Sequence, residues 1–573
     1  MDSSSLLFTL VSCLFFMGLV AWISWRRTRG TVEDKDGYFL AGRGLSSVFI
    51  AGSLLLTNLS AEQLIGLNGS AYGYNLSSMA WEVTAAVATI AMALIFLPRY
   101  LAGAFTTLPE FLNDRFDNTV RRMSVILFML GYGLVTIPSV LYSGSIAVMQ
   151  LFDIPQLTGL DYFPALVVTV VAIGAIGSVY AIFGGLKAVA VSDTINGIGL
   201  LIIGVLVPVL GLIALGQGDF GDGLSRLVSD HPEKLNAIGG ADDPTPFGTL
   251  FTGMLFANLF YWCTNQYVIQ RTLGAASLAE GQKGVLFSGF FKVLVPFMMM
   301  IPGVIAYHLY GPGLGSIDQA YPRLIRDVLP VYLSGFFLAV LLGAVFSSFN
   351  SLLNSAATLF ALDVYGPWSR TKPEGKQLVR VAKIASIVIA LFSFLVAPLL
   401  YFAEQGLWQV IRVFTGFYNI PTVVIVIVGL FTTRVPALGA KLVILFHVTA
   451  YGLLRFVFDD AITIHFLHQY AILFVIEVGI MLAVGAWQPR EKAWAFTSNS
   501  KVDMTPWAFA RPLAFTLFSC VVALYLLFSD IGLASGQGLQ LPFVVALSAL
   551  VACNLAYWVW KAKAEPRSEA AIS

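Results

Sequence analysis

A run of polar side chains interrupts a very apolar part of the chain at residues 56–67, which read LTNLSAEQLIGL. A helix that breaks inside lipid releases backbone carbonyls, which are tolerated only where they face protein or a water-filled cavity. Polar side chains in lipid-embedded helices are also costly and usually line a site. The run therefore predicts an unwound segment whose oxygens coordinate an ion, as discontinuous helices do elsewhere. Its polar residues are Asn58, Ser60, Glu62 and Gln63.

Charged and hydrogen-bonding side chains recur inside other apolar segments. Glu82, Lys292 and Arg412 lie in SSMAWEVTAA, GFFKVLVP and WQVIRVFTGFYNIP. Clustered oxygen ligands suit a hard cation such as sodium, and the charged and amide groups suit a polyhydroxylated or acidic solute. Serines alone fit helix packing equally well, and the charged residues could form structural ion pairs. The other polar positions are Asn258, Tyr261, Asn265 and Gln266 in FANLFYWCTNQYVIQRT, and Ser347, Ser348, Asn350, Ser351, Asn354 and Ser355 in GAVFSSFNSLLNSAAT.

The composition predicts an all-α polytopic membrane protein. Of the 573 residues, 58% are hydrophobic and 11% are charged, whereas soluble domains carry roughly 25% charged residues. The net charge of +1 gives no sign of a nucleic-acid partner, and we expect none. The four cysteines lie in apolar stretches and the five histidines lack ligand spacing, so we expect no disulfide framework and no His–Cys metal centre. The sequence contains no nucleophile–base pattern, so we do not expect an enzyme.

Windows of about 20 apolar residues predict fifteen membrane spans. Placing the N-terminus outside makes alternate loops cytoplasmic and also makes the C-terminus cytoplasmic. Positive residues accumulate in cytoplasmic loops, and in this arrangement only Arg226, Lys234, Arg323, Arg326 and Arg455 lie outside. The predicted spans are 5–25, 46–72, 78–98, 123–150, 162–183, 190–216, 247–270, 284–310, 331–365, 384–402, 406–431, 436–457, 464–487, 512–530 and 540–560.

Motifs spread over residues 37–430 resemble those of the sodium/solute symporter family, specifically its bacterial sodium–glucose/galactose cotransporter branch. The chain also looks similar to uncharacterised symporters of the YidK type. The motifs are GYFLAGRGL (37–45), NLSAEQLIG (58–66), LPEFL (108–112), GGLKAVAVSD (184–193), NLFYWCTNQYVIQRTL (258–273), EGQKG (280–284) and SSFNSLLNSAATLFALDVY (347–365).

The resemblance implies an inverted repeat of five plus five helices with extra helices at both ends, about 14–15 spans in all. We expect residues 1–45 to form an extra N-terminal helix and a cytoplasmic loop. Residues 46–431 would form the ten-helix transport core, and residues 432–573 the additional C-terminal helices with a short cytoplasmic tail.

The resemblance also places sodium, the coupling ion, at the break in the first core helix. It implies oxygen ligands from Leu56 and Leu59 in that helix, and from Ala344, Ser347 and Ser348 in the eighth core helix. Some members hold a second sodium with an acidic residue and with serines that lie one turn further along the eighth core helix. The corresponding positions here are Asp193, Asn350 and Ser351, so the second site is only partly matched.

The solute and gate residues of the family also have counterparts here. Two positions depart from the family pattern: the family has a serine where this chain has Ala85, and a glutamine where this chain has Arg412. An arginine favours a negatively charged sugar such as a uronate or a sulfated sugar; alternatively, Arg412 pairs with Glu82 and the solute is neutral. The solute positions are Asn58, Gln63, Glu82, Asn258, Lys292 and Arg412, the inner gate is Tyr261, and the outer gate is Leu67, Trp81 and Trp408.

We therefore expect sodium-coupled symport of a hexose or hexose derivative by alternating access in the bacterial inner membrane. The expected partners are a small-molecule sugar, sodium and the lipid bilayer. An acidic sugar, a polyol, an amino acid or a carboxylate is the alternative solute. A further alternative is a non-transporting sensor of the same fold. The lack of a signalling domain argues against this alternative.

Overall fold

Helices make up nearly all of the protein. The computed structural model describes residues 3–28, 35–314, 317–369, 373, 375–402, 407–458 and 461–564. Within these ranges it contains no strand, only two isolated backbone bridges. The predicted all-α class is confirmed.

Twelve helices in the described ranges are long and apolar enough to cross a membrane, and a bent pair counted as one span makes thirteen. Two further predicted spans are not in this count: 162–183 contributes only a shorter apolar helical stretch, Tyr162–Ser178, and 247–270 is divided into shorter pieces. The polytopic fold is thus confirmed. The long helices are α1 (Ser3–Thr28), α5 (Ala80–Ala91) with α6 (Leu97–Gly103), α8 (Asn118–Leu130) with α9 (Ile137–Phe152), α11 (Tyr162–Leu215), α15 (Leu278–Val295) with α16 (Ile301–Tyr310), α18 (Ser334–Leu359), α20 (Gly375–Val396), α21 (Leu407–Phe431), α22 (Ala437–Phe456), α23 (Phe466–Trp487), α24 (Ala510–Leu527) and α25 (Leu541–Ala564).

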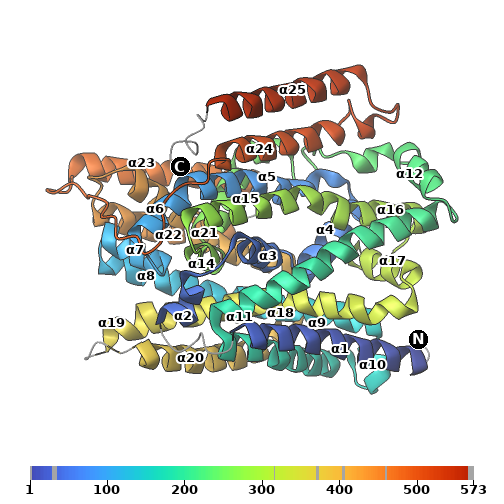
Figure 1. The fold of residues 1–573 in the computed structure, drawn as a ribbon, viewed down its shortest axis with the longest axis horizontal. Helices are drawn as coiled ribbons and strands as arrows, with labels where there is room; N and C mark the ends of the chain where they lie inside the picture. Colours follow the sequence, from blue (N-terminus) through green and yellow to red (C-terminus); the bar gives the residue numbers. More distant parts are fainter. Residues whose placement is uncertain are drawn as a thin grey trace, which may run out of the picture.

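The connections between spans gather at two opposite ends of the bundle. Figure 1 shows α12 (Phe220–Ser229) and α17 (Ala320–Val328) at the right, the same end as the N-terminus. The short helices α2 (Lys35–Leu40), α7 (Leu108–Arg115) and α19 (Gly366–Trp368) lie at the left. This alternation agrees with the predicted order of outer and inner loops. Which end faces the cytoplasm remains a prediction.

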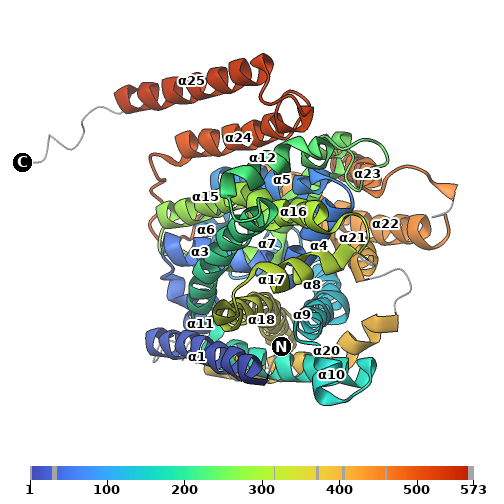
Figure 2. The same cartoon turned by 90° about the vertical axis from the view of Figure 1, so that its right-hand side faces the viewer.

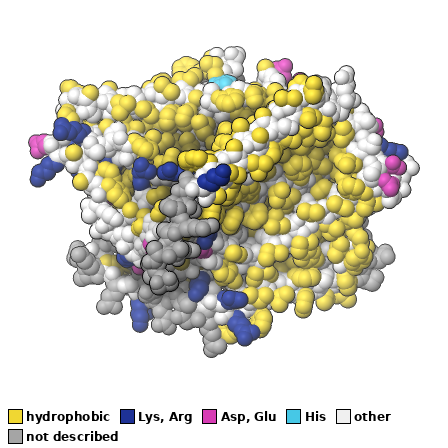
Figure 3. All heavy atoms as spheres, turned by 45° about the horizontal axis from the view of Figure 1, so that its top comes forward, with side chains coloured by type: hydrophobic (Ala, Val, Ile, Leu, Met, Phe, Trp, Pro, Cys, Tyr) yellow, Lys and Arg dark blue, Asp and Glu magenta, His cyan; other side chains and the backbone are white. Residues whose placement is uncertain are grey.

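The outer surface of the bundle is apolar between those ends. Figure 3 shows a broad expanse of hydrophobic side chains, with charged side chains at its left and right borders and further Lys and Arg side chains near the middle and the lower edge of the view. Helix α25 lies at the edge of the molecule beside α24 in both ribbon views (Figures 1 and 2), and only 6% of its most apolar window is buried by protein. Such a helix is stable in this position only where lipid covers it.

The first broken helix lies where the sequence predicts it. Helix α3 (Ser47–Asn58) and helix α4 (Ala61–Gly73) meet at an angle of 58°. Leu59 and Ser60 between them have extended backbone angles. The Gln63 side chain accepts the Ser60 backbone N–H at 2.9 Å, so a side chain replaces the helical carbonyl that this N–H would otherwise reach. The predicted unwound segment is confirmed, and its non-helical part consists of two residues, Leu59 and Ser60.

A second interruption divides the predicted span 247–270. Helix α13 (Gly253–Leu259) passes into a π-helical turn over Phe260–Thr264, and α14 (Gln266–Leu273) follows after Asn265. Asn265 is extended, with φ −76° and ψ 117°. The apolar pattern predicts one continuous span here, and the prediction of its continuity is wrong. In the predicted repeat, the two broken segments occupy corresponding positions in the two halves, an arrangement that marks the binding site of many transporters.

Helix α21 is fixed at its C-terminal end by one buried arginine. Arg115 is fully buried. Its guanidinium donates to the carbonyl oxygens of Gly429, Val435 and Thr432 at 2.8, 3.1 and 3.1 Å. Gly429 lies in the last turn of α21, where carbonyls have no intrahelical donor and carry partial negative charge. Thr432 and Val435 follow in the turn before α22, so the arginine supplies donors to the end of the helix and to this turn.

We expect Arg115→Lys to destabilise the protein, because a single ammonium group cannot reach three carbonyls in the planar geometry of guanidinium. Leaving one or two buried carbonyls without a donor costs about 1–3 kcal/mol. The measurement is the thermal midpoint of the detergent-solubilised protein, with the exposed Arg511→Lys as the control. Equal midpoints for the two variants would contradict the capping role.

Candidate functional site

One polar cavity lies beside the two helix interruptions. It has a volume of about 200 Å³. Its wall also includes Ala85, one of the two positions that depart from the family pattern. The structure thus brings together side chains that the sequence analysis selected from distant segments. Among the predicted solute, gate and sodium residues, the wall contains Asn58, Gln63, Leu67, Trp81, Glu82, Asn258, Tyr261 and Ser348.

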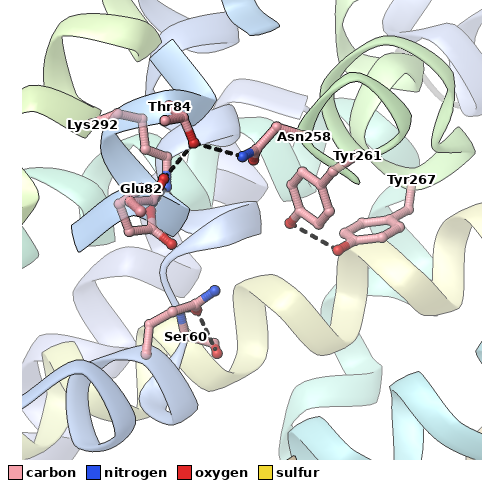
Figure 4. A network of polar contacts seen from close by, with 9 residues as sticks. Ser60, Glu82, Thr84, Asn258, Tyr261, Tyr267 and Lys292 are labelled. Atoms are coloured by element: carbon pink, nitrogen blue, oxygen red, sulfur yellow. Dashed lines mark hydrogen bonds and ion pairs between the residues drawn. The ribbon is translucent and has the colours of Figure 1, made fainter. Parts of the chain in front are cut away.

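A buried ion pair stands at one side of the cavity. Glu82 on α5 and Lys292 on α15 contact each other directly, and their side chains are only 6% and 0% exposed (Figure 4). The Lys292 ammonium also lies 5.5 Å from the centre of the Trp262 ring. Two buried charges without partners would be very costly, and the pairing offsets that cost. Glu82 and Trp262 reach the cavity, whereas Lys292 is not among its wall residues and lies behind these two side chains.

Amide groups supply the other hydrogen-bonding capacity. The Asn258 side chain donates to the Thr84 hydroxyl at 2.9 Å, as Figure 4 shows. The side-chain oxygen of Asn58, Oδ1, is buried and has no hydrogen-bond partner in the described part of the chain. A buried polar atom of this kind is costly unless a ligand or water meets it. Gln63 also lines the cavity, but its side-chain oxygen is already engaged by the backbone and hydroxyl of Ser60, so only its amide nitrogen remains for a solute.

Aromatic rings close the cavity beside Asn258. Tyr267 donates its hydroxyl to Tyr261 at 2.8 Å (Figure 4). Tyr132 contacts the side-chain oxygen of Asn265, the residue at the second interruption, and accepts the backbone N–H of Tyr267 at 3.3 Å. Tyr261 is therefore one member of a hydrogen-bonded tyrosine group rather than an isolated gate residue. This network connects the predicted inner gate to the backbone of the second broken helix.

The first predicted sodium site lies between the break and α18. The carbonyl of Leu56 would accept the Ser60 N–H in a continuous helix, but Gln63 takes that N–H. The freed oxygen instead accepts the Ser348 hydroxyl at 3.3 Å. Leu59 and Ala344 are fully buried and Ser347 is nearly so. The structure thus brings the Leu56 carbonyl and the Ser348 hydroxyl together; their role as sodium ligands, together with Leu59, Ala344 and Ser347, stays a prediction.

The partly matched second site contains a cation of the protein itself. Ser53 donates to Asp193 at 2.7 Å and accepts from the Arg271 guanidinium at 2.8 Å. Arg271 also contacts the Ser351 hydroxyl and is fully buried. Asp193 and Ser351 therefore share a network with an arginine that the sequence analysis quotes within a motif but does not assign to the site. Asn350 lies on the wall of a separate small cavity with Ser347.

Some predicted residues lie outside the described part of the structure. The backbone of α21 includes Trp408 and Arg412, but their side chains are not described. The pairing of Arg412 with Glu82 is thus untested, and the partner that the structure gives Glu82 is Lys292. Several wall residues were not predicted from the sequence because they lie in apolar or aromatic surroundings: Thr136, Tyr418, Asn419, Phe466 and Tyr470.

A helical bundle with two interrupted helices beside one polar cavity is the arrangement of secondary transporters. The model of the sodium:solute symporter family matches residues 38–445, and the chain belongs to this family. It is accordingly a multi-pass membrane protein that carries a small solute by symport, and sodium is its coupling ion. The predicted family resemblance, fold and coupling ion are confirmed.

Comparison with known proteins gives relatives over most of the chain. The chain is 43% identical to the uncharacterized symporter YidK of Escherichia coli (strain K12), over 97% of both chains. It is 32% identical to the sodium/glucose cotransporter of Vibrio parahaemolyticus, covering 74% of this chain and 80% of that protein. Its fold resembles that of a Na+-coupled sialic acid symporter in an outward-open state, with a TM-score of 0.73 at 21% identity, covering 85% of this chain and 98% of that one.

We expect Ser348→Ala to raise the sodium concentration needed for half-maximal uptake by about fivefold, because one hydroxyl oxygen beside the freed Leu56 carbonyl is lost. Ser393→Ala on α20 is the matched control, because that serine bonds only within its own helix, to Ile389. The measurement is sodium activation of solute uptake in vesicles. Unchanged activation in Ser348→Ala would remove this residue from the ion site.

Tyr261→Ala should shorten the retention of bound solute more than it weakens recognition, because it removes an aromatic lid and its hydrogen bond to Tyr267. Tyr261→Phe keeps the ring and should show a smaller effect. The measurement compares the solute release rate with the half-saturating concentration, with the exposed Tyr332→Ala as control. Wild-type release from the alanine variant would exclude a gating role.

Proposed function

We propose that the solute is a sugar, a hexose or hexose derivative, carried together with sodium by alternating access. The observation that carries this proposal is the composition of the cavity wall. Carboxylate, amide and hydroxyl groups occupy part of it, and the rings of Trp81, Tyr261 and Trp262 occupy another. A sugar presents a polar rim of hydroxyls and flatter C–H faces, so it needs both kinds of surface. The name of the Vibrio parahaemolyticus relative, a sodium/glucose cotransporter, supports the same class.

Sodium would drive accumulation through its own gradient. An ion entering a negative interior gains about 2.3 kcal/mol per 100 mV, and a tenfold concentration gradient adds about 1.4 kcal/mol. One ion per cycle therefore supports roughly 500-fold accumulation of a neutral solute. Coupling requires that sodium stabilise the solute-ready state more than other states. The Leu56 carbonyl is suited to this task because it lies two residues from Asn58, which faces the cavity.

We assign residues 46–431 to the transport core, with residues 1–45 and 432–573 outside it. The bacterial inner membrane is the proposed location, with the N-terminus outside and the C-terminus cytoplasmic. An acidic sugar is the second candidate solute, and Arg412 favours it because the family has a neutral glutamine at this position. The sequence places Arg412 three residues before Thr415, which lines the cavity.

Arg412→Gln tests the substrate class. If the solute is anionic, the change should cost about tenfold or more in affinity, because a buried charge loses its counter-ion. If it is neutral, the effect should be mild, because Glu82 keeps Lys292 as its partner.

The measurement is paired uptake of galactose, glucuronate and a sulfated hexose in the wild type and in Arg412→Gln. Arg323→Gln, an exposed charge change, is the control. An unchanged ranking of the three solutes would exclude the acidic-sugar candidate, and failure of all three to be taken up with sodium would exclude the sugar class.

A further inference from the structure

A helix outside the predicted transport core contributes to the cavity wall. Phe466 and Tyr470 both line the cavity, and both belong to α23. They lie one turn apart near the N-terminal end of that helix, and their rings contact each other with centroids 5.7 Å apart. The matched family region ends at residue 445, so these side chains come from beyond it.

Helix α23 is packed tightly against the broken segment that carries Asn258. A Cβ atom at Gly253 of α13 would lie 1.7 Å from the Leu467 carbonyl oxygen, so the two backbones touch there. Further along, the rings of Phe256 and Phe474 stack with centroids 3.8 Å apart. The position of α23 is therefore set by direct contact with a helix of the site rather than by lipid.

A buried histidine joins the same helix to α21. His447 on α22 lies 2.6 Å from Glu477 on α23 and 2.9 Å from the carbonyl of Gly416 on α21, measured from its two ring nitrogens. Both side chains are fully buried. Each ring nitrogen faces an acceptor, so one hydrogen lies toward Gly416 and one proton is shared between His447 and Glu477. The His447–Glu477 pair therefore carries no net charge inside the bundle, whichever of the two side chains holds the shared proton.

Aromatic contacts connect this histidine to the cavity. The ring of Tyr451 stacks on His447 with centroids 5.5 Å apart, and it contacts the ring of Tyr470 at 6.0 Å. Tyr451 also occupies the space beside Gly416, where a Cβ atom would lie 2.2 Å from its hydroxyl. A continuous set of contacts therefore runs from Glu477 through His447 and Tyr451 to a wall residue of the cavity.

We infer that α23, which α22 contacts through the buried His447–Glu477 pair, forms a wall of the solute site, in which Tyr470 and Phe466 help to determine which solute fits and that pair positions them. Tyr470 supplies a hydroxyl and a flat face, and Phe466 supplies an apolar face at right angles to it. The role of these residues in solute choice rests on the proposed function, which supplies the class of solute. The position of α23 at the cavity does not depend on the proposed function, so the role and the position are tested separately.

Thiol labelling tests the wall without knowledge of the solute. Tyr470→Cys is made with Cys520→Ser and Cys553→Ser, because these two native cysteines are partly or fully exposed, whereas Cys13 and Cys263 are buried. A small water-soluble thiosulfonate should modify position 470. It should not modify Val475→Cys, whose side chain lies on the same helix but is 66% exposed on the outer, apolar surface. Equal labelling of the two positions, or no labelling at 470, would overturn the placement.

Uptake measurements test specificity. Tyr470→Phe and Tyr470→Ala should change the half-saturating concentration of some sugars about fivefold or more relative to others, while sodium activation stays within about twofold. An unchanged solute ranking in both variants would overturn the role in specificity. If no sugar is transported by the wild type, the proposed solute class fails, and the labelling result alone decides whether α23 lines the site.

The positioning pair has its own test. Glu477→Gln keeps a donor for a neutral His447, so it should leave solute affinity within about twofold of the wild type. Glu477→Leu and His447→Phe remove the contact and should raise the half-saturating solute concentration about fivefold or more at equal amounts of membrane protein. If Gln and Leu at 477 behave alike, or if only the thermal midpoint changes, the positioning role is wrong.

Discussion

The break between α3 and α4 is the constraint on which the site depends. Inside a membrane every backbone N–H and carbonyl needs a partner, and an interruption leaves several without one. Here Gln63 takes the Ser60 N–H, and Ser348 of a helix far along the chain meets the freed Leu56 carbonyl. The interruption is thus stable only while α18 lies beside it. The same oxygen that needs a partner is the one that a cation can use.

At three places in the described part of the chain, buried charges are matched by opposite charges or dipoles. Glu82 meets Lys292, and Asp193 reaches Arg271 through Ser53. Arg115 meets carbonyls at the end of α21 and in the turn that follows it. Each arrangement joins segments distant in sequence, so none forms until the helices are assembled. Removing one member leaves an uncompensated charge, which costs more than the pair contributes.

The sequence predicted the parts of the structure that depend on local patterns. Apolar length identified most of the spans, and the polar run at 56–67 identified the first break, because both follow from the cost of polar groups in lipid. The interruption at Asn265 was missed, since its surroundings, FYWCTNQY, are largely aromatic and apolar. Arg271 was seen as part of a motif, but its contacts with Ser53 and Ser351 depend on tertiary packing. Partners of this kind cannot be inferred from spacing.

The same limitation explains why the predicted boundary at residue 431 does not coincide with the wall of the cavity. A boundary drawn from a repeat counts helices along the chain, whereas a cavity is formed by whatever packs beside it. Helix α23 reaches the cavity because Gly253 has no side chain to hold the two backbones apart. The uncharacterized symporter YidK aligns over 97% of this chain, which therefore includes this hairpin or nearly all of it. The proposed wall of the solute site therefore lies beyond the family region, in a segment that this relative shares wholly or nearly so.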